Sequence, residues 1–150
     1  MTKQDLTNPA SLGDIVQNIN SMDWFDLGGG TKFKLLRYNE INGDWVLYVN
    51  MQPGAEFAAH KHLSSGQYFV TKGELIYDVG SATAGTYGYE PIGSVHTMAH
   101  CKVETEMLFI GHGAVAFTDD VGGVRFILNH EFLRDISQNK VVADISNEAL

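Results

Sequence analysis

Hydrophobic and polar residues alternate in short segments between about residue 31 and residue 128, and clusters of Gly, Pro, Asn and Asp separate these segments. Such alternation is typical of a strand with one buried face, and the clusters are typical of turns. The segments "TKFKLLRY" and "DWVLYVNM" flank "NEINGD", in which Asn42 and Gly43 favour a tight hairpin turn. A series of short strands of this kind predicts an all-β sandwich or barrel.

The same pattern predicts the remaining elements. Further strands are expected at "AEFAAHKH", "QYFVT", "ELIYDV", "YGYE", "VHTMA", "ETEMLFIG", "AVAFTD" and "VRFIL", and a loop is expected at "GSATAGT". Asn129 is a suitable N-cap for a closing helix at "HEFLRDISQ". A short N-terminal helix is expected to begin at Ser11, although Gly13 disfavours it. Trp24 and Phe25 are expected either to pack against the barrel or to mediate subunit contact.

Length and composition narrow the class of protein. The 150 residues suit one domain, with an N-terminal arm over 1–30, a barrel and closing helix over 31–137 and a tail over 138–150. A net charge of -8 argues against nucleic-acid binding. No apolar run approaches the roughly 20 residues of a membrane span, and the N-terminus lacks an apolar targeting core, so we expect a cytoplasmic protein without a membrane partner. Because Cys101 is the only cysteine, any metal must be held by nitrogen and oxygen.

Two histidines lie one residue apart in "PGAEFAAHKHLSSGQYFVTKG". Because successive strand side chains point to opposite faces, His60 and His62 share one face and Lys61 points to the other. Such a pair is either a surface feature or two ligands of one metal ion. A second stretch, "GTYGYEPIGSVHTMAH", contains a third histidine, His96, after a predicted turn.

These two stretches resemble the two sequence motifs of the cupin superfamily. Eight residues match at the motif spacing, namely Gly54, His60, His62, Gly73, Gly85, Pro91, Gly93 and His96. The resemblance implies a double-stranded β-helix, which is a jelly-roll barrel, with short helical segments at both ends. It also implies that His60, His62 and His96 converge on one metal ion inside the barrel.

The sequence departs from the cupin motifs where most members have a glutamate and an asparagine. Gly66 or Gln67, depending on the spacing, stands at the glutamate position, and His100 replaces the asparagine. The simplest site therefore has three neutral imidazoles and no carboxylate. We expect Gln67 to point into the barrel, because it shares strand parity with Phe69 and Thr71, and Gly66 to end a loop. His100 is a fourth ligand, a hydrogen-bond partner of a ligand, or a pocket residue.

A narrower resemblance, over about residues 31–134, is to the three-histidine cupin dioxygenases that cleave acetylacetone or 2,4'-dihydroxyacetophenone. It implies Fe(II) on the three histidines, with Zn, Ni or Mn as alternatives, and it places the acidic residue Glu90 beside them. We expect Glu90 or Gln67 to orient the substrate, and Tyr68 to be a barrel-wall aromatic residue or an acid or base. Asp78 stands where the acetylacetone-cleaving enzyme has an arginine.

The chemistry of three neutral ligands favours a particular substrate class. They would leave the charge of a divalent cation uncompensated, which favours an anionic chelating substrate, such as an enolised β-dicarbonyl or hydroxyketone, that reacts with O2. We therefore expect a non-haem Fe(II) dioxygenase that cleaves a carbon–carbon bond. The alternatives are a zinc-bound sensor or binding module, as in the cupin half of certain anti-sigma factors, and a redox-neutral isomerase or lyase. A homodimer is expected from the family and from the N-terminal arm.

Overall fold

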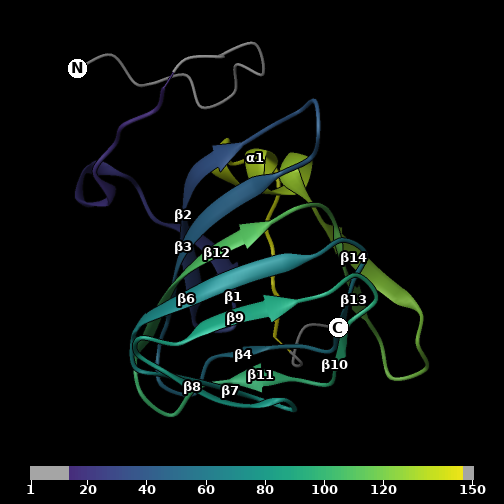
Figure 1. Ribbon diagram of the computed structural model, residues 1–150. Helices are drawn as coiled ribbons and strands as arrows, with labels where there is room; N and C mark the ends of the chain where they lie inside the picture. The colour runs from purple at the N-terminus through teal and green to yellow at the C-terminus, as the bar shows by residue number, and fades with distance from the viewer. Residues whose placement is uncertain (1–13, 147–150) are drawn as a thin grey trace.

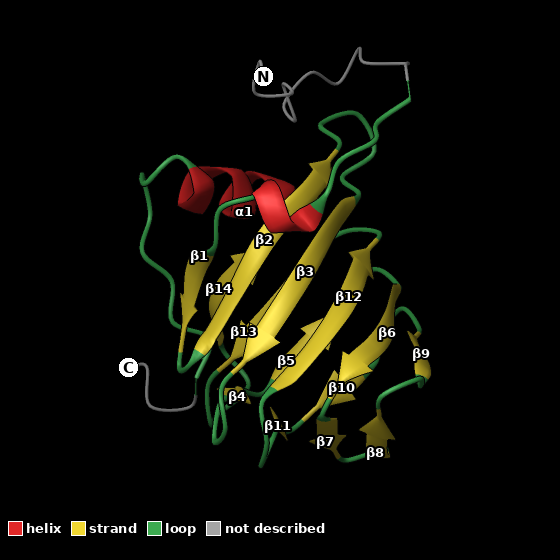
Figure 2. Cartoon of the chain, turned by 90° about the vertical axis from the view of Figure 1, so that its left-hand side faces the viewer, coloured by secondary structure: helices red, strands yellow, loops and turns green. Residues whose placement is uncertain are grey.

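Antiparallel strands form the walls of the barrel. The computed structural model describes residues 14–146. Over this range the strands form one six-stranded sheet, β1-β2-β3-β12-β6-β9, and two four-stranded sheets, β10-β5-β13-β14 and β4-β11-β7-β8. Figure 2 shows the large sheet facing the viewer, with the smaller sheets behind and below it. This arrangement confirms the all-β barrel predicted from the alternation.

The elements follow one another with short connections, and Figure 1 traces them along the chain. The strands are β1 (Phe25–Gly28), β2 (Thr31–Tyr38), β3 (Trp45–Met51), β4 (Glu56–Phe57), β5 (His60–His62), β6 (Gly66–Lys72), β7 (Glu74–Tyr77), β8 (Gly80–Thr83), β9 (Tyr87–Glu90), β10 (Val95–His96), β11 (Ala99–His100), β12 (Thr105–Gly111), β13 (Val115–Thr118) and β14 (Val124–Leu128). A 3-10 helix, η1 (Ile19–Ser21), precedes the strands, and the α-helix α1 (His130–Ser137) follows them.

The hydrophobic core lies between the large sheet and the smaller sheets. Phe33 on β2, Met51 on β3 and Met107 on β12 are fully buried in it. Burying a side chain of this size contributes about 1.5–3 kcal/mol to stability. The large sheet therefore supplies a firmly packed wall against which a site can be built.

Two predicted strands are each divided in the structure. The segment expected as one strand over residues 55–62 forms β4, which pairs with β11, and β5, which pairs with β10 and β13. The segment over 95–99 is likewise divided between β10 and β11. The chain bends between the two halves so that each half joins a different sheet, as happens at the corners of barrels. Alternation alone does not mark such a corner.

The predicted loop at residues 80–86 is wrong for its first half. Gly80–Thr83 forms β8, which pairs antiparallel with β7 along its whole length. Only Ala82 of this strand is buried, so the edge strand has small or exposed side chains. Backbone hydrogen bonding holds it in the sheet, and this leaves little trace in the hydrophobic pattern.

The two ends of the described chain cover the barrel differently. The closing helix α1 is confirmed, with the Asn129 side chain accepting a hydrogen bond from the backbone N–H of Phe132 at 2.9 Å. The expected start of an N-terminal helix lies outside the described residues, and within 14–24 the helical segment is η1. Trp24 lies under the Lys34 amine, and the Phe25 ring packs on Phe33. These two residues therefore pack against the barrel, and the homodimer stays a prediction.

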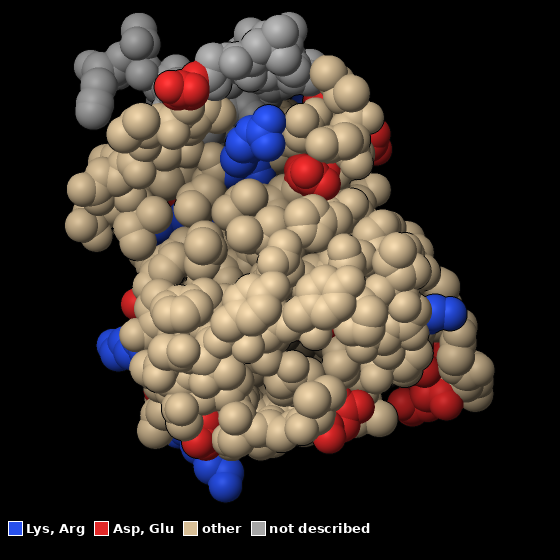
Figure 3. Space-filling model, in the orientation of Figure 1, with Lys and Arg blue, Asp and Glu red and all other residues tan. Residues whose placement is uncertain are grey.

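The surface outside β6 and β9 is poor in charge. On the face drawn in Figure 3, which includes these strands, charged side chains lie toward the top and along the lower edge, and few lie in the middle. Tyr87 and Tyr89 on β9 are exposed, whereas Glu90, the next residue, is buried. Side chains alternate along a strand, so Glu90 points into the barrel.

Among residues 14–146, no helix has the length and apolarity needed to cross a membrane.

Replacing Gly73 with alanine is expected to destabilise the fold far more than replacing Gly54. Both have positive φ, at +77° and +87°, which costs an alanine about 1–2 kcal/mol. A Cβ on Gly73 would also lie 2.2 Å from the carbonyl oxygen of Glu104, whereas one on Gly54 would have no neighbour within 4 Å. Urea unfolding of both variants measures the difference. Equal losses would show that the tight turn after β6 relaxes freely.

Candidate metal centre

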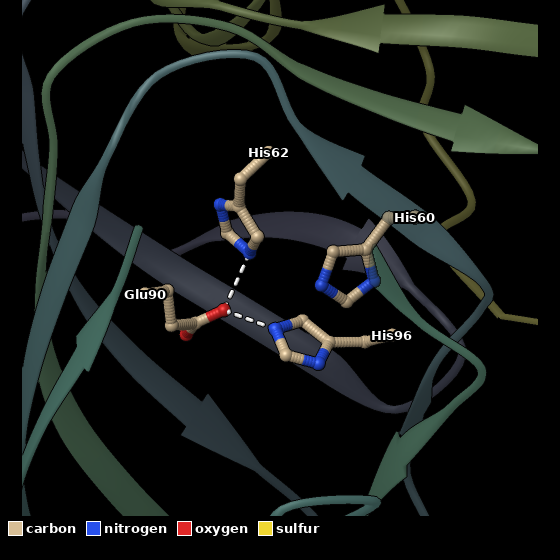
Figure 4. A group of neighbouring side chains, drawn as sticks. All are labelled: His60, His62, Glu90 and His96. Atoms are coloured by element: carbon tan, nitrogen blue, oxygen red, sulfur yellow. Dashed lines mark ion pairs between the residues drawn. The ribbon is translucent and has the colours of Figure 1, made fainter. Parts of the chain in front are cut away.

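Three strands bring four polar side chains together inside the barrel. His60 and His62 come from β5, His96 comes from β10, and Glu90 comes from β9 of the large sheet. Because β5 and β10 pair with His96 opposite His60, the three histidines lie on one inward face. Figure 4 shows the three rings and the carboxylate pointing toward one another. The exposed fraction of each of the four residues is 7% or less.

The donor atoms are close enough to share one ion. One nitrogen of each histidine and one oxygen of Glu90 all lie within 4.8 Å of one another. The Oε2 atom of Glu90 is 2.5 Å from Nε2 of His62 and 2.8 Å from Nε2 of His96. Three imidazoles and a carboxylate form a donor set that suits zinc and the other first-row divalent metals.

Hydrogen bonds from the outer ring nitrogens determine which nitrogen faces the cluster. Nδ1 of His60 lies 2.7 Å from the carbonyl oxygen of Ala58, and Nδ1 of His96 lies 3.0 Å from Oδ1 of Asp78. Both partners only accept hydrogen bonds, so each Nδ1 carries the proton. Nε2 of each neutral ring is then an unprotonated donor, as in metal-binding histidines whose other nitrogen is held in this way.

The contacts of Glu90 fit a cation between the side chains. In neutral His96 the proton is on Nδ1, so Nε2 and Oε2 of Glu90 are two acceptors facing each other at 2.8 Å. Nε2 of His62 is buried and makes no hydrogen bond, although it lies 2.5 Å from the same oxygen. Two acceptors this close repel unless a proton or a metal ion lies between them. The residues therefore fit a divalent metal ion.

Burial and charge shift the pKa values of these groups. Burial lowers the pKa of His60 to about 4, so its ring is neutral at neutral pH. Burial alone would raise the pKa of Glu90, but the adjacent His62 and His96 rings, which favour the charged carboxylate when they are protonated, outweigh it and lower that pKa to about 2. The Glu90 carboxylate raises the pKa of His96 against the opposing effect of burial. The cluster thus contains an ionised carboxylate that attracts a cation.

The expectation of a site without a carboxylate is corrected by the position of Glu90. Where β6 pairs with β9, Glu90 stands directly opposite Gly66, one of the two positions considered for the missing cupin glutamate. The carboxylate therefore comes from the neighbouring strand. If Glu90 binds the metal, it cancels one of the two positive charges of a divalent cation.

The expected orientation of Gln67 is also wrong. Its side-chain amide lies 3.0 Å from Nε2 of His112 and accepts a hydrogen bond from the Tyr87 hydroxyl at 2.6 Å, so it points away from the cluster. Gly66 begins β6 rather than ending a loop, and it is buried. A Cβ on Gly66 would lie 3.1 Å from the Phe109 ring. The predicted strand parity is correct, but the face that Gln67 shares with Phe69 is the exposed one.

Tyr68 belongs to the barrel wall, with its ring stacked on Phe109 at 6.2 Å between centroids. Its hydroxyl is 2.7 Å from that of Tyr77, and burial raises the pKa of Tyr68. Tyr77 is the tyrosine nearer the cluster, because its ring lies edge-on to His96 at 5.1 Å. Tyr68 therefore reaches the cluster through Tyr77.

His100 lies outside the group of four. It is on β11, between β4 and β7, and pairs with Glu56 on one side and Ile76 on the other. The cluster found among the described residues does not include it. Its role as a ligand, a partner of a ligand or a pocket residue stays a prediction.

The cluster lies in a cavity of about 70 Å³ with otherwise apolar walls. These walls include Trp45, Phe57, Leu75, Met107, Phe109 and Phe117. Ligand sites commonly combine apolar walls with a few polar groups that fix orientation. A ligand here would be small, with its polar end at the histidines and an apolar remainder.

Sequence reasoning assigned no role to Tyr77 or Asp78, which both contact His96. These residues end β7 and begin the turn to β8, in a different sheet from β10. No spacing rule connects them with His96, because the contact crosses between sheets. The one indication in the sequence that position 78 matters is that Asp78 stands where the acetylacetone-cleaving enzyme has an arginine.

The fold is a jelly-roll barrel in which three histidines point inward from the sheet that contains β5 and β10. Such a barrel and site define a cupin with a candidate metal centre. The chain belongs to the family of ChrR cupin-like domains, whose model matches residues 12–116. This membership confirms the superfamily expected from the two sequence motifs.

Individual proteins of known name or structure are similar to this chain in sequence or in fold. The chain is 32% identical over 102 residues to the acetylacetone-cleaving enzyme of Acinetobacter johnsonii, covering 64% of this chain and 67% of that enzyme. The crystal structure of an acetylacetone dioxygenase from Acinetobacter johnsonii is similar with a TM-score of 0.76 and 25% identity, over 86% of this chain and 93% of the other. An RmlC-like cupin from Ralstonia eutropha, at 17% identity and a TM-score of 0.79, shares the fold over 86% of this chain and 87% of its own.

Proposed function

We propose that this protein is a metal-dependent dioxygenase that cleaves a carbon–carbon bond of a small β-dicarbonyl or hydroxyketone. The observation that carries the proposal is the cluster of three histidines and Glu90 within a small apolar cavity. The similarity to the acetylacetone-cleaving enzyme supports the reaction class. A β-dicarbonyl fits the cavity because it combines a compact apolar body with two oxygens at one end.

Each group of residues at the site would have a distinct role in this reaction. His60, His62 and His96 would hold Fe(II), which when bound supplies the reactivity toward O2. The Glu90 carboxylate, ionised and beside the ring nitrogens, would hold the metal or accept the proton lost when the substrate enolises. Apolar walls would exclude water and align the body of the substrate. Gln67 points away, so orienting the substrate falls to Glu90 and to Tyr77, which lines the cavity.

Protein prepared without oxygen and loaded with Fe(II) is expected to consume O2 when a β-diketone or hydroxyketone is added. Oxygen uptake and product masses over a panel of both classes would be measured. The His96→Ala variant and the zinc-loaded protein are the controls, and both should be inactive. Iron-loaded protein that consumes no O2 with any substrate would contradict the proposal. Turnover without O2 would instead identify a redox-neutral lyase or isomerase.

A zinc-bound sensor or binding module is a second candidate, and the position of Glu90 favours it. Four protein donors around one ion are typical of closed structural zinc sites, whereas catalytic sites keep a position open. The two candidates differ in exchangeable water on the metal. The visible absorption of the Co(II)-loaded protein would change on adding azide if the site is open, because azide can replace the bound water. A closed four-donor site would show no change with azide and would retain zinc after purification.

A further inference from the structure

The Asp78 carboxylate is the one described side chain that bonds to the outer nitrogen of a histidine in the cluster. Its Oδ1 lies 3.0 Å from Nδ1 of His96, whereas Nδ1 of His60 bonds to backbone. We propose that Asp78 is a positioning residue that holds the His96 ring in the orientation and tautomer in which Nε2 faces the metal centre. The inference rests on the proposed metal centre but not on the reaction performed there.

The position of Asp78 in the fold makes this contact specific. It follows β7 and begins the two-residue turn to β8, since Tyr77 and Gly80 pair directly. His96 is on β10, which pairs with β5 in a different sheet. The hydrogen bond therefore joins two sheets at the ligand itself. The His96 side chain is 3% exposed and that of Asp78 37%, so the carboxylate reaches inward from the surface.

Chemistry explains what the contact would do to His96. An ionised carboxylate only accepts hydrogen bonds, so its partner Nδ1 must carry the proton. The lone pair of the neutral ring is then on Nε2, which lies 2.8 Å from Oε2 of Glu90 inside the cluster. A carboxylate at the outer nitrogen also makes the ring a stronger donor to a metal. Without Asp78, no described side chain holds the proton on Nδ1, because the remaining polar contacts of the ring, with Oε2 of Glu90 and with Oγ of Ser94 at 3.3 Å, are both at Nε2.

Asp78→Ala is expected to weaken Co(II) binding by about 10- to 100-fold, the usual cost of losing such a partner. Metal-free protein would be titrated with Co(II), and its visible absorption would report both affinity and ligand geometry. Asp78→Asn should lose less affinity, because its carbonyl oxygen still accepts from Nδ1 although the charge is gone. In the zinc-loaded protein, a slowly exchanging Nδ1 proton of His96 should be visible by NMR in the parent and absent in Asp78→Ala.

Asp44→Ala is the matched control, because Asp44 has a 32% exposed side chain and lies 3.5 Å from Nδ1 of His112, away from the cluster. It should bind Co(II) like the parent. Unchanged affinity, absorption and NMR signal in Asp78→Ala would overturn the inference, as would an equal loss in Asp44→Ala. If Asp78→Ala does not fold, Asp78→Asn decides by the same readouts. A parent protein that binds neither Co(II) nor Zn(II) would overturn the metal centre together with this role.

Discussion

Replacing His96 with alanine is expected to abolish metal retention, whereas the same change at His100 is expected to leave most of it. Removing His96 deletes one of three ring nitrogens and the contact of Nε2 with Glu90 at 2.8 Å. Loss of a residue that merely supports a ligand costs about 10- to 100-fold in affinity, so loss of the ligand should cost more than about 100-fold. Metal content after gel filtration, measured by mass spectrometry, tests the expectation.

His100→Ala is a demanding control, because it removes the same kind of side chain only four residues along the chain. His100 lies on β11 and takes no part in the cluster. Thermal unfolding of both metal-free variants would show that each still folds. Equal metal loss in the two variants would make His100 a ligand and contradict the assignment to His60, His62 and His96.

Gly66→Glu is expected to destabilise the protein strongly. A Cβ there would lie 3.1 Å from the Phe109 ring. That ring is held between Trp45 and Tyr68, stacked at 5.5 Å and 6.2 Å, so it has little room to move. Overpacking of this kind costs about 1–3 kcal/mol. The new carboxylate would also stand opposite Glu90, where like charges repel. The free energy of unfolding in urea measures the loss.

Gln67→Glu provides the neighbouring control on the same strand. Its side chain points toward His112 and Tyr87, so the charge would lie outside the barrel and the metal affinity should stay unchanged. The reverse result, in which Gln67→Glu alters the metal affinity and Gly66→Glu leaves the fold intact, would mean that β6 faces the other way.

Much of the site was predictable because its signals are local or set by motif spacing. Alternation put His60 and His62 on one face, and the motif spacing added His96. The same reasoning failed at Gln67. Alternation shows which side chains share a strand face, but it does not show which of the two faces is buried. It also failed at the two divided strands, because backbone bends at Ala59 and Thr97 leave no mark in the hydrophobic pattern.

The sequence by itself therefore determined the β-rich architecture and three histidines of the cluster. Strand period, turn residues and motif spacing act over a few neighbouring residues, so they can be read along the chain. The family resemblance already placed Glu90 near the histidines, but only the tertiary structure decided that its carboxylate joins their ring nitrogens and that Asp78 contacts His96. Glu90 reaches the cluster because β9 pairs with β6 at a position where the opposite residue is a glycine. Asp78 reaches His96 because it follows β7, whose sheet lies against the sheet that contains β10. Such contacts depend on the pairing of distant strands, which alternation within each strand does not specify.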